Sequence, residues 1–282
     1  FAPFASVIGE LMHWSIERLI FIAWLAQVVF TPLIALPTDL VDNHFLLLAL
    51  STGAVGAVAF FILTTTVMRT WHLSWSGLKP HWSGDFNWLI FAGLVVVDAI
   101  FTVLNTGEMP SLHRANWDFT LSAFEAAVME ETLFRFAILG ILFYAWRNVK
   151  QRLPLALATS SILFGIVHLT NYGPQEWSMT VLQAVSAAGI GLFFATVYVY
   201  TGQLWLAMLM HFLLDWTAFI ASDSTLMTGK VTVQDWIGTG IELVVFIGIA
   251  VWMMFGQRRQ VMERHVNRLT GEHQRFDFMI QY

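Results

Sequence analysis

The sequence predicts an all-α, polytopic membrane protein built as one bundle of eight transmembrane helices. Of its 282 residues, 57% are hydrophobic and only 12% are charged, whereas soluble proteins contain about 25% charged residues. The mean hydropathy is +0.66, and the apolar residues gather in long runs. Because a helix needs about 20 mostly apolar residues to cross a bilayer, these runs favour membrane helices over the core of a soluble enzyme.

Eight apolar runs are candidates for these spans. The fifth has about 17 residues, which is near the lower limit for a span. The fourth is long, so we expect it to be tilted or broken near Gly140. The length fits one bundle, which gives a single transmembrane domain over residues 1–256 and a polar tail over 257–282, either a short cytoplasmic helix or a disordered extension. The approximate limits of the runs are 17–36, 44–68, 87–105, 118–146, 154–170, 178–200, 203–221 and 233–255.

The basic residues are distributed unevenly between the two sides of the membrane. With the N-terminus in the cytoplasm, 11 of the 14 Lys and Arg residues lie on the inner side. Two, Arg114 and Lys230, lie outside, and Arg135 falls within the fourth run. Because cytoplasmic loops are enriched in Lys and Arg, this distribution supports eight spans with both termini inside. We expect a prokaryotic plasma membrane for a chain of this size.

Composition also excludes several kinds of site. The chain has no cysteine, so disulfides, thiolate nucleophiles and cysteine-based metal sites are ruled out. The net charge of −5 gives no reason to expect nucleic acid as a partner. The lipid bilayer is the partner that the composition predicts.

Six ionisable residues fall into three short motifs within the apolar runs, and the first motif is EETLFR. A formal charge in the middle of a membrane helix costs roughly 2.5–3.5 kcal/mol, so such residues normally pair, face water or do chemistry. Glu131 and Arg135 are four residues apart and share a helix face, where they can form an ion pair. Glu130 points elsewhere and has no such cation. Two carboxylates in unlike environments are typical of acid–base sites, although a structural salt bridge between helices is the alternative.

The second motif, FGIVH, places Phe164 one turn before His168, where the aromatic ring can orient the imidazole. Taken alone, a membrane histidine is more often a structural hydrogen bond between helices. The third motif, HFLLD, places His211 and Asp215 on one face, where the carboxylate can fix the imidazole tautomer. A structural hydrogen bond within the helix is the alternative reading of that pair.

The three motifs together are more informative than each alone. At about 1.5 Å of rise per residue, Glu130, His168 and His211 can reach a common layer inside the bilayer. We therefore expect them to line one central polar cavity.

The order and spacing of these motifs resemble the CPBP family, the CAAX-processing and bacteriocin-processing enzymes also called the ABI family. The resemblance rests on E-E-x-x-x-R, F-x-x-x-H and H-x-x-x-(N/D) on successive motif helices and covers roughly residues 118–221. It implies an eight-helix bundle with a cavity open to the membrane, and an intramembrane glutamic endopeptidase related to the CAAX prenyl-protein endopeptidases. No Ser or Cys nucleophile accompanies the motifs, so attack by water is preferred over an acyl-enzyme.

The resemblance also implies roles for individual residues. Glu130 would be the general base that activates water, and His168 would hold that water or help to activate it. His211 and Asp215 would face the oxyanion of the tetrahedral intermediate, while Glu131 and Arg135 would support the site. Other members of the family carry Asn at the position of Asp215, and an Asn amide can donate a hydrogen bond to an oxyanion. Asp215 can donate only when it is protonated. Its alternative role is to orient His211.

The implied substrate is a peptide or a membrane-anchored protein segment, with or without a prenyl group, and no cofactor is expected. Two alternatives stay open. Glu130, His168 and His211 are also the ligand types of a catalytic zinc site, which would make the chain a zinc-dependent membrane protease. Intramembrane carboxylates and histidines also serve proton relays, which would suit a non-catalytic transporter or a bacteriocin-immunity protein.

Three further residues complete these expectations. Asp98 lies inside the third run, where it could pair with a cavity residue or with a neighbouring helix, and we favour the structural contact. Glu125 precedes Glu130 by about one and a half turns and could line the mouth of the cavity. His265, in the polar tail, is expected to be solvated.

Overall fold

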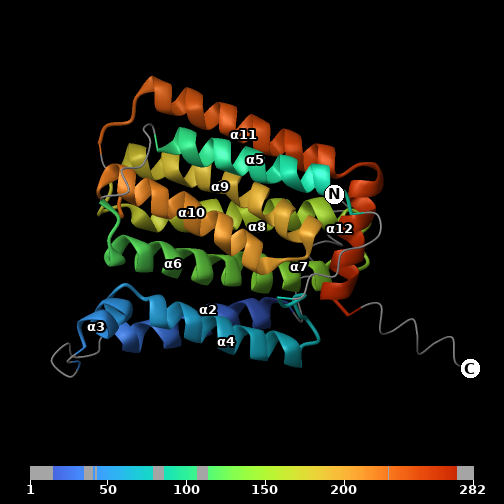
Figure 1. The fold of residues 1–282 in the computed structure, drawn as a ribbon. Coiled ribbons are helices and arrows are strands. Elements are labelled where there is room, and N and C mark those ends of the chain that lie inside the picture. Colours follow the sequence, from blue (N-terminus) through green and yellow to red (C-terminus); the bar gives the residue numbers. More distant parts are fainter. Residues whose placement is uncertain are drawn as a thin grey trace, which may run out of the picture.

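The computed structural model describes residues 15–34, 41, 43–78, 86–106, 114–227 and 229–271, and all regular elements within them are helices (Figure 1). This confirms the all-α prediction. The elements are α2 (Ser15–Ile34), α3 (His44–Ser51), α4 (Ala54–Thr70), α5 (Trp88–Asn105), α6 (Trp117–Glu131), η3 (Thr132–Ile138), α7 (Leu139–Ala145), α8 (Arg152–Val167), η4 (His168–Asn171), α9 (Trp177–Thr201), α10 (Leu204–Ser222), α11 (Val233–Met253) and α12 (Gly256–Leu269).

Polar residues begin several of the apolar helices. Asn43, Asn87 and Asn116 accept hydrogen bonds from backbone N–H groups in the first turns of α3, α5 and α6. Thr232 and Asp235 form a reciprocal capping box at the start of α11. The first N–H groups of a helix have no partner within the helix, so these side chains satisfy donors where each apolar run begins.

Each of the eight predicted runs is helical in the described residues, but fewer helices are long and apolar enough to span a bilayer. Four qualify within that part of the chain: Arg152–Asn171, α9, α10 and α11. A fifth is obtained if α3 and α4, which are bent by 62°, count as one broken span. The fourth run is not among them, because it contains several charged residues, namely Glu125, Glu130, Glu131 and Arg135. The protein therefore has several apolar helices suited to a membrane, while eight spans remains a prediction.

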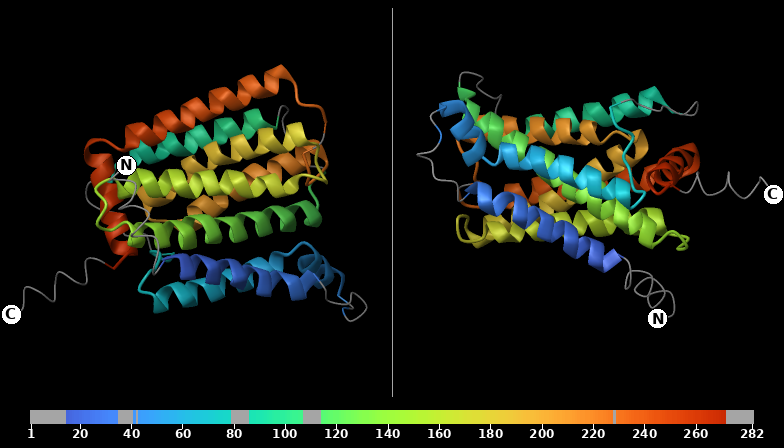
Figure 2. Two further views of the ribbon diagram at one scale, coloured as in Figure 1. Left: turned by 180° about the vertical axis from the view of Figure 1, so that it is seen from behind. Right: turned by 90° about the horizontal axis from the view of Figure 1, so that it is seen from below.

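Helix α9 lies in the middle of the bundle, with α2 and α4 on one side and α5 and α11 on the other (Figures 1 and 2). Its second half is almost continuously buried, from Phe193 to Thr201. Helix α8 packs closely on α9 at Gly165, where an added Cβ would lie 2.5 Å from the backbone oxygen of Ala184. Small residues allow such close contacts between membrane helices.

The irregularity in the fourth run lies at Thr132–Ile138, which is π-helical, rather than at Gly140, which is inside α7. It follows the paired glutamates directly. Single π-helical turns inside α-helices occur frequently at functional sites. The segment inserts an irregular turn between the carboxylates of α6 and the buried helix α7.

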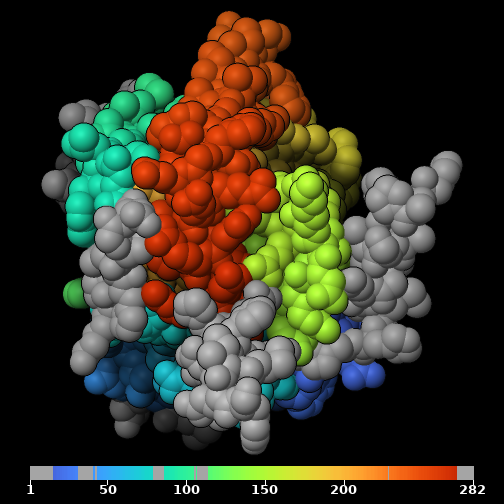
Figure 3. Space-filling view, turned by 90° about the vertical axis from the view of Figure 1, so that its right-hand side faces the viewer, coloured from blue at the N-terminus to red at the C-terminus, as the bar shows by residue number. Residues whose placement is uncertain are grey.

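The polar tail begins with an ordered helix. Helix α12 lies across one end of the bundle (Figures 1 and 3) and buries Val261, Met262 and Val266. His265 is only 2% exposed, and its Nδ1 lies 3.0 Å from the carbonyl oxygen of Val199. The expectation that His265 is solvated is therefore wrong, because it lies on the apolar face that α12 turns to the bundle. Residues 272–282 of the predicted tail lie outside the described residues.

The span count can be tested with single cysteines, because the chain has none of its own. With eight spans and both termini inside, a membrane-impermeant thiol reagent should label Arg114→Cys and Lys230→Cys in intact cells. It should label Leu78→Cys and Lys150→Cys only after the membrane is opened. Labelling of positions 78 and 114 from the same side would show that α5 does not cross.

Candidate active site

The three motifs meet where α6 and η3 pack against α8 and α10. Glu130 and Glu131 end α6, Arg135 lies in η3, and His211 and Asp215 lie on α10. The motif segments, residues 130–135, 164–168 and 211–215, are far apart in the chain, and helix packing brings them together. The resulting motif cluster consists of Glu130, Glu131, Arg135, Phe164, His168, His211 and Asp215.

The ion pair expected from the i,i+4 spacing is present. The Nε of Arg135 lies 3.1 Å from Oε2 of Glu131, and the two side chains are 1% and 0% exposed. The guanidinium also lies over the Phe164 ring, with Cζ 4.1 Å from the ring centre, a distance typical of a cation–π contact. A buried carboxylate without this cation would be very unfavourable in an apolar environment.

The imidazole of His211 lies between three carboxylates and is itself 5% exposed. Its Nδ1 is 2.9 Å from Oε1 of Glu131. Its Nε2 is 3.3 Å from Oδ2 of Asp215 and 3.8 Å from Oε2 of Glu130. Glu131 is therefore the carboxylate that contacts Nδ1 and orients the ring, a role that the i,i+4 spacing had suggested for Asp215. Asp215 instead faces Nε2 together with Glu130.

The two adjacent glutamates have different environments. Glu131 is fully buried and contacts both Arg135 and His211. The Glu130 side chain is 25% exposed, although its Oε2 atom is itself buried and has no hydrogen-bond partner among the described residues. This difference in burial and in contacts is the one that the sequence predicted for the two carboxylates. Glu130 is therefore the more exposed of the two glutamates.

His168 joins the cluster through Phe164. Its Nδ1 lies 2.8 Å from the carbonyl oxygen of Phe164, and its ring packs edge-on against the Phe164 ring at 4.8 Å between centres. In the neutral imidazole, a hydrogen on Nδ1 donates to that carbonyl, so Nε2 is left as an acceptor. The Phe164 ring also lies 6.0 Å from that of His211. The expected contact between the Phe164 ring and the His168 imidazole is therefore present.

Several residues near the cluster carry no motif. Phe194 of α9 packs its ring 5.6 Å from that of His211, and Gly191 of the same helix lies against Phe164. Nothing in the local sequence of α9 distinguishes these two from ordinary membrane-helix residues. Glu242 of α11 accepts a hydrogen bond from the hydroxyl of Ser186, 3.1 Å away. A carboxylate within the apolar run GIELVVF was a signal that could have identified that pair.

The two weaker candidates lie at the edges of the cluster. Asp98 is 9% exposed on α5, and α5 packs against α10. Glu125 lies against the bend between α3 and α4, since a Cβ at Gly53 would come within 2.9 Å of its Cγ. Gly53 has a positive φ of 83°, which glycine adopts without strain. No hydrogen bond or ion pair of Asp98 is seen among the described residues, but its carboxylate interacts electrostatically with His211 of α10.

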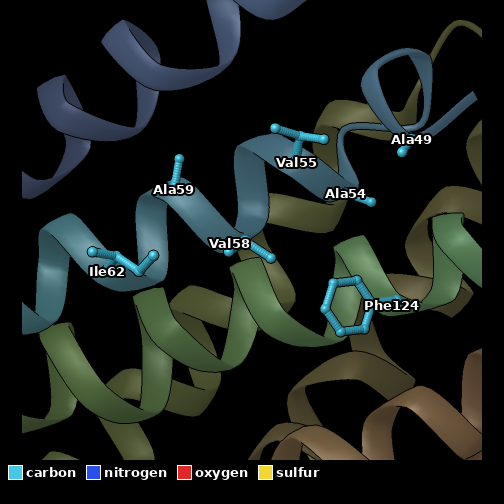
Figure 4. A pocket seen from close by; sticks show the side chains of 7 residues that line it. All are labelled: Ala49, Ala54, Val55, Val58, Ala59, Ile62 and Phe124. Carbon is cyan, nitrogen blue, oxygen red and sulfur yellow. The ribbon is translucent and has the colours of Figure 1, made fainter. Parts of the chain in front are cut away.

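An apolar groove of about 400 Å³ lies between the α3–α4 pair and α6 (Figure 4). None of the motif residues lines it, so it is not the central polar cavity that the sequence predicted, and that cavity remains a prediction. The lining residues of the groove are Ala49, Ala54, Val55, Val58, Ala59, Ile62 and Phe124.

Within the described residues, no group of three or more His, Asp or Glu side chains has an arrangement suited to holding a metal ion. The zinc ligands that the sequence offered were Glu130, His168 and His211. Of these, His211 turns both ring nitrogens to carboxylates, and the Nδ1 of His168 faces a backbone carbonyl.

Comparison with known proteins agrees with the motifs. Residues 113–217 match the family described as type II CAAX prenyl endopeptidase Rce1-like. No curated protein and no solved structure matches the chain. The matched region contains all the residues of the motif cluster and the helices that bring them together. This match supports the predicted resemblance of the motif-bearing region to the CPBP family of CAAX-processing proteases.

Proposed function

We propose that this protein is an intramembrane endopeptidase that hydrolyses a peptide bond by the attack of a water molecule activated by Glu130. The family match supports a CAAX-protease-like membrane endopeptidase in general terms. The observation that carries the specific mechanism is the position of His211. Its imidazole is anchored at Nδ1 by the buried Glu131 and presents Nε2 to the partly exposed Glu130 and Asp215.

In this mechanism Glu130 is the general base. Its carboxylate takes a proton from water while the water oxygen forms a bond to the carbonyl carbon of the substrate. The free Nε2 of His168 accepts a hydrogen bond from the same water and holds it. After attack, Glu130 returns the proton to the amine nitrogen as the C–N bond breaks. A general base of this kind contributes about 10²- to 10⁴-fold to the rate.

His211 is the residue proposed to face the oxyanion. A proton on its Nε2 is directed toward Glu130 and Asp215, the exposed side of the cluster, where the tetrahedral intermediate would form. Fixed donors aimed at a developing negative charge are usually a large contribution to catalysis. Asp215 lies beside Nε2 of His211 and, when protonated, donates a second hydrogen bond to the oxyanion.

The proposed substrate is a peptide or a membrane-anchored protein segment. The matched family is named for prenyl endopeptidases, and the wholly apolar lining of the groove in Figure 4 suits an apolar lipid anchor beside the scissile segment. A prenylated C-terminus is therefore one form of this substrate, and an apolar peptide leader is the other.

The first prediction concerns the base. Glu130→Gln should lower cleavage by at least about 100-fold, because an amide cannot take the proton from water. Cleaved products are identified by comparing the membrane peptidomes of cells expressing wild type and variant. Rates are then measured on a recovered substrate in proteoliposomes.

Glu242→Gln is the matched control, because it makes the same change at a partly buried carboxylate that is bonded to Ser186 outside the cluster. It should retain the wild-type rate. Undiminished cleavage by Glu130→Gln, with normal folding, would remove Glu130 from the mechanism.

The second prediction concerns the supporting ion pair. Arg135→Met should lower the free energy of unfolding in mixed micelles by about 3–5 kcal/mol, because it leaves the buried Glu131 without its cation. Adding Glu131→Gln should restore part of the loss, since the unpaired charge is then absent. Arg259→Met, in the partly exposed Arg259–Glu263 pair of α12, should cost at most about 1 kcal/mol. Equal losses for the two arginine variants would contradict this assignment.

The third prediction separates the proposed mechanism from the zinc alternative. Purified protein treated with a strong chelator and then freed of it should keep its full activity. Metal content is measured on the same samples. An activity that is lost on chelation and returns on adding zinc would favour a zinc protease.

A further inference from the structure

The Phe164 ring is the point at which the motif segments touch one another. The Arg135 guanidinium lies over its face, with Cζ at 4.1 Å from the ring centre. The rings of Phe134, His168 and His211 lie 5.1, 4.8 and 6.0 Å away, all close to perpendicular. Phe164 is only 2% exposed. Its ring therefore has no open direction in which to move without displacing one of these partners.

The remaining side of the ring is closed by Gly191 of α9, a helix that carries none of the motifs. A Cβ at position 191 would lie 2.9 Å from Cδ1 of Phe164 and 3.4 Å from Nη2 of Arg135. Contacts below 3.0 Å are essentially never seen for real Cβ atoms, so the ring or the guanidinium would have to shift. The absence of a side chain at this position gives the ring its space.

The backbone does not explain a glycine here. Gly191 lies inside the regular helix α9 and is not among the glycines with positive φ. Glycine in a helix interior is less favourable than alanine by about 0.8–1.0 kcal/mol. This unfavourable helix propensity is therefore offset by the packing of Phe164, which needs the space that a Cβ would fill.

We propose that Gly191 is a positioning residue of the active site. It touches no reacting group, and it acts by letting Phe164 lie where it aligns Arg135, His168 and His211. An alanine at this position moves the ring and, through it, the two imidazoles. The kinetic part of this inference rests on the proposed peptidase function.

The kinetic test compares Gly191→Ala with Gly189→Ala. The control makes the same change two residues earlier in α9, where the new Cβ would lie 3.2 Å from the flexible end of Leu243 and at ordinary contact distances of 3.6 and 3.7 Å from Phe246 and the Cα of Leu243, all on α11. Gly191→Ala should lower kcat by about 10- to 100-fold, as expected for a displacement of catalytic groups by a fraction of an ångström to 1 Å. KM should stay unchanged in both variants, and Gly189→Ala should keep the wild-type kcat. An unchanged kcat in Gly191→Ala would overturn the proposal.

A double-mutant cycle shows whether the effect passes through the ring. Alanine at position 164 lacks the Cδ1 atom that the new Cβ would meet at 2.9 Å, and keeps only the Cβ at 3.5 Å, an ordinary contact distance. In the Phe164→Ala background, Gly191→Ala should therefore lower kcat no further. An equal loss in both backgrounds would overturn the proposal. Should Gly191→Ala alone fail to fold, the comparison of Phe164→Ala with the double variant still decides the question, because the space left by the ring then accepts the methyl group.

A readout independent of cleavage separates this inference from the proposed function. Ring ¹⁵N resonances of His168 and His211 can be recorded in micelles with ¹⁵N-histidine, and assigned by their loss in His168→Gln and His211→Gln. Gly191→Ala should shift both signals and Gly189→Ala neither. Unmoved signals in Gly191→Ala would overturn the positioning role. Shifted signals in a protein that cleaves nothing would support that role and refute the peptidase.

Discussion

The active-site region depends on one buried chain of contacts, Arg135 to Glu131 to His211. The guanidinium holds the Glu131 carboxylate at 3.1 Å, and the other carboxylate oxygen holds Nδ1 of His211 at 2.9 Å. All three side chains are at most 5% exposed. In an environment of low dielectric each member is stable only with its partner present. The chain thereby fixes the direction of the imidazole and leaves Nε2 as the nitrogen that faces Glu130 and Asp215.

Aromatic rings surround this series of polar contacts and restrict the positions of the guanidinium and of both imidazoles. Phe164 lies under the guanidinium and against both imidazoles, while Phe194 approaches His211 from α9. Aromatic pairs favour such tilted and edge-on geometries. The central helix α9 therefore shapes the site although it contributes no ionisable group to it. A rigid surrounding shell is what holds catalytic groups within the small tolerances that chemistry requires.

The proposed function depends on the different environments of two adjacent residues. Glu131 is fully buried and contacts Arg135 and His211, whereas the Glu130 side chain is 25% exposed. The π-helical segment Thr132–Ile138 follows them directly and carries Arg135, the partner of Glu131. This difference in environment makes a water-activating role for Glu130 chemically reasonable inside an otherwise apolar bundle.

The sequence by itself determined the helical class, the membrane character and the local pairs. Glu131 with Arg135 and Phe164 with His168 follow from an i,i+4 spacing, because a helix fixes the relation of residues one turn apart. That Glu131 rather than Asp215 contacts Nδ1 of His211 could not be predicted from spacing, since Glu131 and His211 are on different helices and 80 residues apart in the chain. Likewise, only the tertiary structure revealed the space at Gly191, the bend between α3 and α4, and the burial of His265 under α12. These features depend on the volumes and the polar groups that neighbouring helices bring into contact. A local sequence pattern does not specify which helices become neighbours.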